Sequence, residues 1–324
     1  YKIEDLRVRI GMTMLLLLVY RLGSYVSLPG VDPAQLSQLQ NQASTGLLGL
    51  LDMFSGGAFS NASIFALGIM PYISASIVIQ LLGIAVPYFQ RLQKEGESGR
   101  RKINQITRYL TVFILIFQAP AYLTNLHYQL PPSAFALSGK MFYISSTIIL
   151  TAGSMFIMWL GERITDKGIG NGISMIIMIG IIARMPFAVF AEFASRINQQ
   201  GGGLVMFLVE FVLLFLVFVG TILLVQGTRR IPVQYAKRIV GNKQYGGVRQ
   251  YIPLKVNAAG VMPIIFAQAI MFLPITIAGF ANSESMSAFA TAFSNPYGFW
   301  YNIVYFMLII MFTYFYTAIT VNPN

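Results

Sequence analysis

Charged side chains that could do chemistry inside the apolar segments of this 324-residue chain are few. An ionisable residue in such a segment usually belongs to a proton relay, an ion pathway or a substrate site. The ones that lie in or beside the apolar segments are Arg21, Glu162, Arg184 and Glu210. A proton-coupled pump would need chains of carboxylates or histidines, and we expect Glu210, about two turns inside its segment, to reach interfacial water.

Other catalytic or metal chemistry finds little support. The chain has no cysteine, which excludes disulfides, thiol catalysis and thiolate metal sites. His127 is the only histidine, and we expect it in a solvated external loop rather than in a metal site. A G-x-x-x-x-G-K-[ST] phosphate loop is missing, so any energy source is expected to be a partner. We therefore predict no enzymatic activity and no cofactor.

The composition indicates a membrane protein. Hydrophobic residues make up 56% of the chain and charged residues 10%, outside the usual range of soluble proteins. A hydrocarbon core about 30 Å thick needs about 20 mainly apolar residues per helix. Eight segments qualify: residues 10–28, 64–89, 107–126, 141–160, 173–193, 204–226, 258–281 and 299–320. We predict an all-α, polytopic helical bundle, whose first segment is a true span because no A-x-A-like cleavage site follows it.

Lysine and arginine lie mainly on one side of this bundle. All but four of the 22 precede the first segment or follow the second, fourth and sixth; the exceptions are Arg21, Lys140, Arg184 and Arg196. The positive-inside rule makes that side, and the N-terminus, cytoplasmic. Because Tyr1 is not an initiator methionine, we expect the chain to begin inside a longer one.

Two of the basic loops, residues 94–108 and 226–255, are large enough to bind a partner. The second alternates apolar and aromatic residues with cations, which is typical of a β-hairpin: Val233, Tyr235, Ile239 and Tyr245. Such a surface would suit RNA phosphates or an acidic protein face. Membrane topology alone, or attraction to anionic lipids, explains any single basic loop equally well.

The stretch 54–80 has small and helix-breaking residues where a lipid-facing helix would have leucine or valine: Gly56, Gly57, Gly68 and Pro71. Backbone freed from the helical ladder is tolerated at membrane depth only inside protein or beside a water-filled cavity. We therefore predict that this stretch lines a passage. The preceding loop, residues 48–63, is too short to span and should fold back, either as a pore-blocking plug or as an external cap.

Isoleucines recur near the predicted passage. Ile69 and Ile73 are four residues apart on one helix face, as are Ile173 and Ile177, and Ile265 lies at a similar depth. Isoleucine is abundant in membrane helices, so ordinary packing accounts for most such pairs. The alternative is a narrow apolar ring, which excludes ions by dewetting but yields to a bulky passing chain.

Six stretches of the sequence resemble the SecY family, the channel subunits of the bacterial protein-translocation complex. They are residues 20–32 (YRLGSYVSLPGVD), 53–77, 94–109, 158–174 (MWLGERITDKGIGNGIS), 253–267 and 315–323, in the family's order. The resemblance implies a channel of the general secretory pathway in the bacterial inner membrane. It would pass unfolded polypeptides across the membrane and release hydrophobic helices sideways into lipid.

The resemblance also implies partners and roles for residues. The partners would be SecE-like and SecG-like small membrane subunits, a SecA-like motor ATPase, the ribosome, signal peptides with nascent chains, and the lipid bilayer. The pore ring would contain Ile69, Ile73, Ile173, Ile177 and Ile265, and the plug, within residues 49–63, would contain Met53, Phe54, Ser55, Gly56, Gly57 and Ala58. Lateral-gate candidates are Gln80, Gln118 and Gln268. Partner docking would use Arg100, Arg101, Lys102, Arg229, Arg230, Lys237, Arg238, Lys243 and Arg249.

Family members have ten spans in two inverted five-helix halves. Here residues 1–193 would form the N-terminal half with spans one to five, and 194–324 a partial C-terminal half with spans six to eight and the cytoplasmic loop 227–257. We expect two further spans, the sixth ring residue and the last basic loop after Asn324. At the tip of the second basic loop, Asn242 and Lys243 replace the paired arginines of relatives, which shifts the expected contact to Arg238 and Arg249.

Two other functions stay open. A secondary transporter with broken helices could bind a small solute near two Gly/Pro pairs, Gly68 with Pro71 and Gly260 with Pro263. A structural membrane scaffold is the third possibility. The scarcity of charge at the membrane midplane and the size of the basic loops favour the channel.

Overall fold

The computed structural model describes residues 4–33, 36, 52, 55–135, 139–198, 203–234, 238–240, 243–245, 249–264, 266–267, 270–271 and 298–320. It divides into two compact units, Tyr1–Ala188 with Phe272–Asn302, and Val189–Met271 with Ile303–Asn324. The predicted halves, 1–193 and 194–324, stay a prediction.

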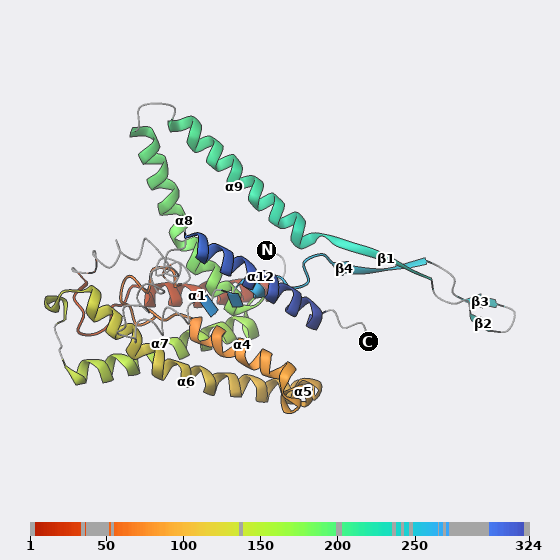
Figure 1. The fold of residues 1–324 in the computed structure, drawn as a ribbon, viewed down its shortest axis with the longest axis horizontal. Helices are drawn as coiled ribbons and strands as arrows, with labels where there is room; N and C mark the ends of the chain where they lie inside the picture. Colours follow the sequence, from red (N-terminus) through yellow and green to blue (C-terminus); the bar gives the residue numbers. More distant parts are fainter. Residues whose placement is uncertain are drawn as a thin grey trace. The chain divides into compact units, whose positions relative to one another are not determined.

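The first unit is built around one long helix (Figure 1). Its helices are α1 (Glu4–Gly23), α4 (Met70–Ala85), α5 (Pro87–Lys94), α6 (Glu97–Gln129), the short 3₁₀ helix η2 (Pro132–Ala134), α7 (Lys140–Lys167) and the first part of α8 (Gly172–Asn198). Helix α6 contacts α4, α5 and α7, and α1 contacts α7.

The second unit combines helices with a two-stranded ribbon. Helix α9 (Gly203–Gln226) runs directly into β1 (Thr228–Gln234), which pairs antiparallel with β4 (Arg249–Lys255) (Figure 1). Between them, β2 (Arg238–Val240) pairs with β3 (Lys243–Tyr245). These pairings confirm the predicted β-hairpin. Helix α12 (Phe299–Thr320) contacts the described part of the seventh predicted segment, where the Phe266 ring lies 5.7 Å from Phe312.

Proline and glycine determine where the second predicted span begins and ends. Residues 64–69 form turns rather than helix, and α4 begins at Met70 with Pro71 in its first turn, where a missing N–H is harmless. The span was therefore placed too early. Helix α4 also ends before the predicted end of the span, because Val86, which precedes Pro87, is extended (φ −112°, ψ 120°). The next helix, α5, is bent by 98° relative to α4.

The first predicted span is wrong at both ends. Helix α1 begins in the charged residues at Glu4 and stops at Gly23 instead of reaching Leu28. The residues after it pair with the chain before α4: the Leu28 N–H donates to the Ala62 carbonyl at 2.8 Å, and the Ile64 N–H to the Val26 carbonyl at 2.9 Å. These backbone hydrogen bonds replace the helical ones that would continue α1.

The other helices match or exceed the predicted segments. Helices α9 and α12 agree closely with residues 204–226 and 299–320, whereas α6, α7 and α8 extend into neighbouring loops. In the part of the chain that is described, five helices are long and apolar enough to cross a membrane: α6, α7, α8, α9 and α12. The bent pair of α4 and α5 would make a sixth. Most of the seventh segment lies outside the described residues, so the count of eight spans stays a prediction.

The lone histidine is in a different place from the one predicted. His127 lies in the last turn of α6, not in a loop, and its ring centroid is 4.5 Å from that of Phe135 and 6.1 Å from that of Tyr143. An aromatic contact at the helix end is its structural role.

Candidate functional site

Segment 55–63 is the described part of the predicted plug. It is folded in turns, and all its residues except Asn61 are buried, which confirms that it folds back against the protein. It contains four of the predicted plug residues, Ser55 to Ala58; Met53 and Phe54 lie outside the described residues. Buried backbone of this kind needs polar partners, and helices distant in the sequence supply them.

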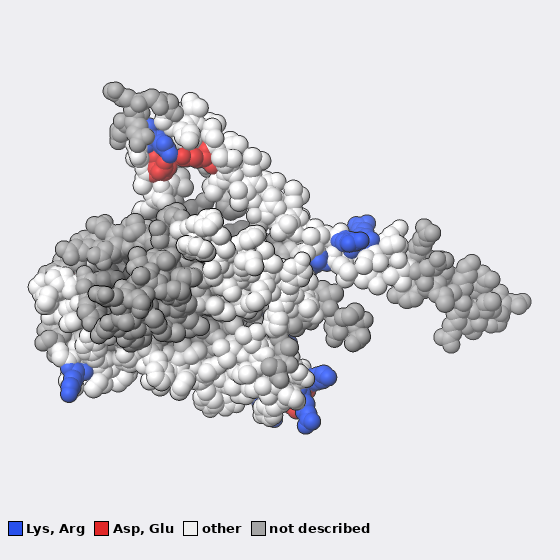
Figure 2. All heavy atoms as spheres, in the orientation of Figure 1, with Lys and Arg blue, Asp and Glu red and all other residues white. Residues whose placement is uncertain are grey.

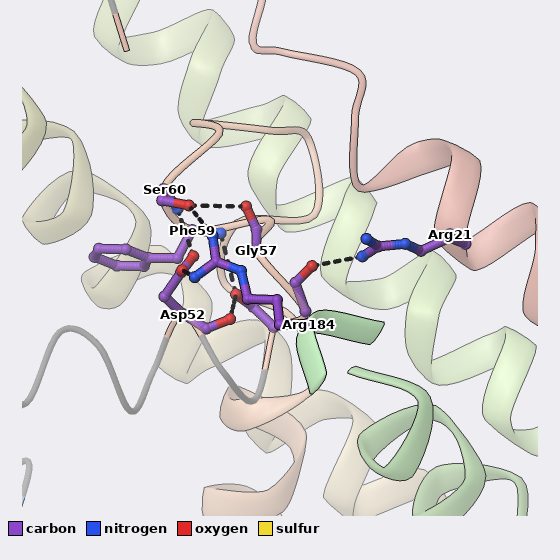
Figure 3. A network of polar contacts seen from close by, with 8 residues as sticks. Arg21, Asp52, Gly57, Phe59, Ser60 and Arg184 are labelled. Atoms are coloured by element: carbon purple, nitrogen blue, oxygen red, sulfur yellow. Dashed lines mark hydrogen bonds and ion pairs between the residues drawn. The ribbon is translucent and has the colours of Figure 1, made fainter. Parts of the chain in front are cut away.

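Two arginines reach segment 55–63 from different helices (Figure 3). Arg21 of α1 donates from Nη1 to the Gly56 carbonyl at 2.6 Å, and its Nη2 donates to the Tyr25 hydroxyl at 2.6 Å. Arg184 of α8 donates from Nη2 to Ser60 Oγ at 3.1 Å and pairs through Nη1 with Asp52 Oδ2. Arg21 and Arg184, two of the arginines in the predicted apolar segments, thus bind one short piece of chain.

Asp52 connects the two ends of this piece. Its side chain is fully buried, and Oδ1 accepts from the Ser60 N–H at 2.8 Å. Its carbonyl accepts from the Gly57 N–H at 2.8 Å and from Ser55 Oγ at 3.0 Å. Oδ2 receives no hydrogen bond from a neutral donor in the described residues and faces the Arg184 guanidinium instead. A buried carboxylate is tolerated only when a charge and hydrogen bonds compensate its lost hydration, as they do here.

Two buried tyrosines complete the polar contacts. Tyr20 of α1 donates its hydroxyl to the Ser55 carbonyl at 3.1 Å, and Tyr122 of α6 donates to the Phe59 carbonyl at 3.0 Å. The Tyr122 and Phe59 rings also meet edge to face, with centroids 4.9 Å apart. Helices α1 and α6 therefore hold segment 55–63 through its backbone carbonyls, and α8 holds it through the Ser60 side chain.

Glycine is required where the segment passes the arginines. Gly56 and Gly57 have φ of +67° and +90°, a region that side chains rarely adopt. A Cβ on Gly57 would lie 3.2 Å from Arg184 Nε, and one on Gly56 would lie 3.0 Å from the Gly180 Cα of α8. The glycines that the sequence marked as helix-breaking thus permit close approach to α8.

Four of the five predicted ring residues lie in one apolar cluster. Ile69 is buried, and Ile73, Ile173 and Ile177 are partly buried against the same group of side chains. We call this group the isoleucine cluster; its fully buried members are Leu17, Tyr20, Ala58, Phe65, Ile69, Ile157, Leu160, Ile164 and Ile176. Ala58 belongs to segment 55–63, so that segment contacts the cluster directly. Ile265 lies outside the described residues.

Two of the three predicted gate glutamines, Gln80 and Gln118, lie in the described part of the chain. Gln80 of α4 is partly buried and donates to Ser76 Oγ at 3.3 Å. Gln118 of α6 has a buried Oε1 that finds no partner among the described residues. Their helices contact each other, while Gln268 lies outside the described residues.

Basic side chains occur at the start of α6 and on the ribbon. Arg100, Arg101 and Lys102 are exposed in the first turns of α6, which the sequence predicted to be a loop. Arg229 and Arg230 are exposed on β1, and Figure 2 shows lysine and arginine atoms over this ribbon. Arg238, Lys243 and Arg249 occupy positions in β2, β3 and β4, and Lys237 lies outside the described residues.

The register of the ribbon separates two faces. Residues opposite each other share a face, so Arg230, paired with Pro253, lies on the face of Tyr251 and Lys255. We call this the basic face. The other face has Arg229, the partly buried Val233 and an exposed apolar group: Ile231, Ile252 and Leu254. The sequence predicted charge and apolar surface on one hairpin but not this separation.

The remaining charged residues of the apolar segments are in ion pairs. Arg108 of α6 binds Glu162 of α7 through two hydrogen bonds of 3.1 and 2.6 Å. We predicted that Glu210 reaches interfacial water; in the structure it also has an ion-pair partner. Its Oε1 accepts a hydrogen bond from Arg196 at 2.6 Å, and Arg196 also donates to Glu192 at 2.7 Å. No group of three or more potential metal ligands occurs in the described part of the chain.

Sequence reasoning missed Asp52. It lies in a loop rather than in a predicted span, and was therefore not counted among the membrane charges. The signal that could have found it is an isolated carboxylate in an otherwise uncharged, small-residue loop, which needs a cation when it is buried.

The family model described as SecY matches residues 63–324. A protein translocase subunit SecY from Aquifex aeolicus is 40% identical over 327 residues, which cover all of this chain and 76% of that protein.

Among solved structures, a protein-conducting channel is similar with a TM-score of 0.61 at 18% identity, covering 96% of this chain and 71% of that one. Sec61 in the canine ribosome–channel complex is similar with a TM-score of 0.52 at 17% identity, covering 85% and 59%. At these identities the likeness concerns the fold. The family model and the full-length relative together establish that the chain belongs to the SecY family.

Proposed function

We propose that this chain forms the protein-conducting channel of a translocase in the bacterial inner membrane, with a cytoplasmic N-terminus. It passes unfolded polypeptides across the membrane and releases hydrophobic helices laterally into lipid, without catalysis of its own. Membership of the SecY family supports this, because the Aquifex aeolicus relative is a translocase subunit and the fold resembles that of a protein-conducting channel.

The observation that carries the proposal is the packing of segment 55–63 against the isoleucine cluster through Ala58. Ile69, Ile73, Ile173, Ile177 and Ile265 form the constriction, and segment 55–63 is the plug that rests on it. An apolar constriction keeps ions out by dewetting. The plug adds a second barrier, and a passing polypeptide displaces both.

Lateral release needs an opening toward lipid. We place Gln80, Gln118 and Gln268 along its edges. Among the described residues, the buried Oε1 of Gln118 has no hydrogen-bond partner, which supports a polar role because such an atom gains a partner when water reaches it.

The energy comes from partners. A SecA-like motor ATPase or a ribosome docks on the exposed cations of α6 and the ribbon, and SecE-like and SecG-like subunits complete the membrane complex. The ribosome as partner is supported by the similarity to Sec61 of the canine ribosome–channel complex. Exposed cations suit the acidic or phosphate surface of such partners.

The test is ion leak and protein translocation by the translocase complex that contains this chain, reconstituted in lipid vesicles. We expect Ile73→Asn and Ile177→Asn to raise the resting ion leak, because an amide hydrates the constriction. Ile73→Leu and Ile177→Leu are the matched controls, since they keep apolar volume and should leave leak unchanged. Motor-driven translocation of a preprotein should require this complex.

If the asparagine variants leak no more than the leucine variants, the isoleucines are not the constriction. If the wild-type complex moves a small solute unaided but no polypeptide, a transporter is the better description.

A further inference from the structure

One face of α8 contacts both the isoleucine cluster and segment 55–63. Ile173, Ile177, Gly180 and Arg184 recur at intervals of four, three and four residues, which places them in one stripe along the helix. The two isoleucines pack against the cluster, and Gly180 approaches Gly56. Arg184 binds Asp52 and Ser60 at the end of the stripe.

This stripe connects the isoleucine cluster to segment 55–63. A shift of α8 large enough to separate Ile173 and Ile177 from the cluster also moves Arg184, because a helix behaves as a rigid element over three turns. The ion pair with Asp52 then has to break or move with it.

The Asp52–Arg184 pair is asymmetric in its exposure. Asp52 is fully buried, whereas 44% of the Arg184 side chain is exposed. Arg184 can therefore remain hydrated after separation, and Asp52 regains water only if segment 55–63 leaves its place. The pair stabilises the seated segment while it is dry, and water replaces it once the segment is displaced.

We propose that the Asp52–Arg184 ion pair is an inhibitory contact that holds segment 55–63 in the resting channel. Asp52 and Arg184 act as positioning residues, and their pair sets how often the segment leaves spontaneously. This inference rests on the proposed channel function. Arg21 contributes less, because its contacts in the segment are limited to the neutral Gly56 carbonyl, and losing it leaves no unpaired buried charge.

The experiment is a double-mutant cycle on resting ion leak in vesicles that contain the translocase complex. The variants are Asp52→Asn, Arg184→Gln and the double variant. We expect each single variant to raise leak about fivefold or more, within the usual range for coupled sites. The double variant should leak about as much as one single variant, because the pair is already broken.

Glu162→Gln is the matched control, since it breaks the Arg108–Glu162 pair of α6 and α7 and should leave leak within about twofold of wild type. Arg184→Lys keeps the charge and should restore most of the barrier. Because a misfolded variant could also leak, each variant is assayed for motor-driven translocation, which only a folded channel supports.

Single variants with wild-type leak would overturn the proposed inhibitory role of the ion pair. So would a double variant whose increase in leak equals the product of the two single increases. A wild-type complex that fails to translocate any preprotein would instead overturn the channel function. The two failures are therefore distinguishable in the same vesicles.

Discussion

Gly153 allows the chain before α4 to pack against α7, and replacing it by alanine tests that packing. Gly153 is buried in the middle of α7, and a Cβ there would overlap the backbone carbonyl of Ile64 and lie 3.3 Å from the Phe65 ring. The obstacle is backbone rather than a mobile side-chain tip, so the turns at 64–69 would have to move.

Two effects oppose each other in Gly153→Ala. Alanine is the better helix former by about 1 kcal/mol. Forcing an extra methyl into a packed interface typically costs about 1–3 kcal/mol, and the overlap with a carbonyl puts this position at the upper end. We therefore expect a net loss of up to about 2 kcal/mol in the free energy of unfolding.

Gly220→Ala is the matched control. Gly220 also lies inside a helix, α9, but nothing is within 4 Å of its would-be Cβ, so only the helix-propensity gain applies. The assay is the apparent melting temperature of the purified complex in detergent, which should fall for Gly153→Ala and stay or rise for Gly220→Ala. Equal changes in melting temperature for the two variants would refute the reasoning, because they would mean that the Ile64 backbone moves aside without loss of stability.

Two further changes test the hydrogen bonds of segment 55–63 and the faces of the ribbon. Tyr122→Phe removes the donor to the buried Phe59 carbonyl, and we expect about 1–3 kcal/mol less stability in thermal melts; an unchanged melt would mean that the carbonyl finds another donor. Arg230→Glu should weaken binding of a SecA-like motor more than Arg229→Glu, because Arg230, unlike Arg229, shares a face with Lys255, and the difference should shrink at high salt. Equal losses would contradict the assignment of the basic face.

The sequence predicted those elements whose signals are local. Helix α9 is bounded by Gly203 and Gly227, and its long apolar run, in which Glu210 is the sole charged residue, predicted its ends closely. Gly68 and Pro71 indicated backbone freed from the helical ladder, although the span was still placed too early, and the alternation in the second basic loop predicted the hairpin. The start of α1 was missed, since Glu4 and the cations after it are not apolar although they continue the helix.

The polar network was unpredictable for a different reason. Asp52 and Arg184 are separated by most of the first unit, and no local pattern pairs them. Arg184 was recognised as a charge at the border of a span, but its partner depends on how segment 55–63 folds back. That fold depends in turn on positive φ at Gly56 and Gly57, which a sequence permits without requiring.

The composition of segment 55–63 explains why polar contacts hold it in place. Of its residues, Phe59 is the sole large apolar one, and the rest are serine, glycine, alanine and asparagine, which bury little apolar surface. Hydrogen bonds weaken steeply when their angle departs from linear, and water can replace both them and the ion pair once the segment is displaced, so a shift of α8 weakens these contacts together. The proposed plug, which must stay in place at rest and leave when a chain passes, is better held by polar contacts that water can replace than by a large apolar surface, whose exposure to water is costly.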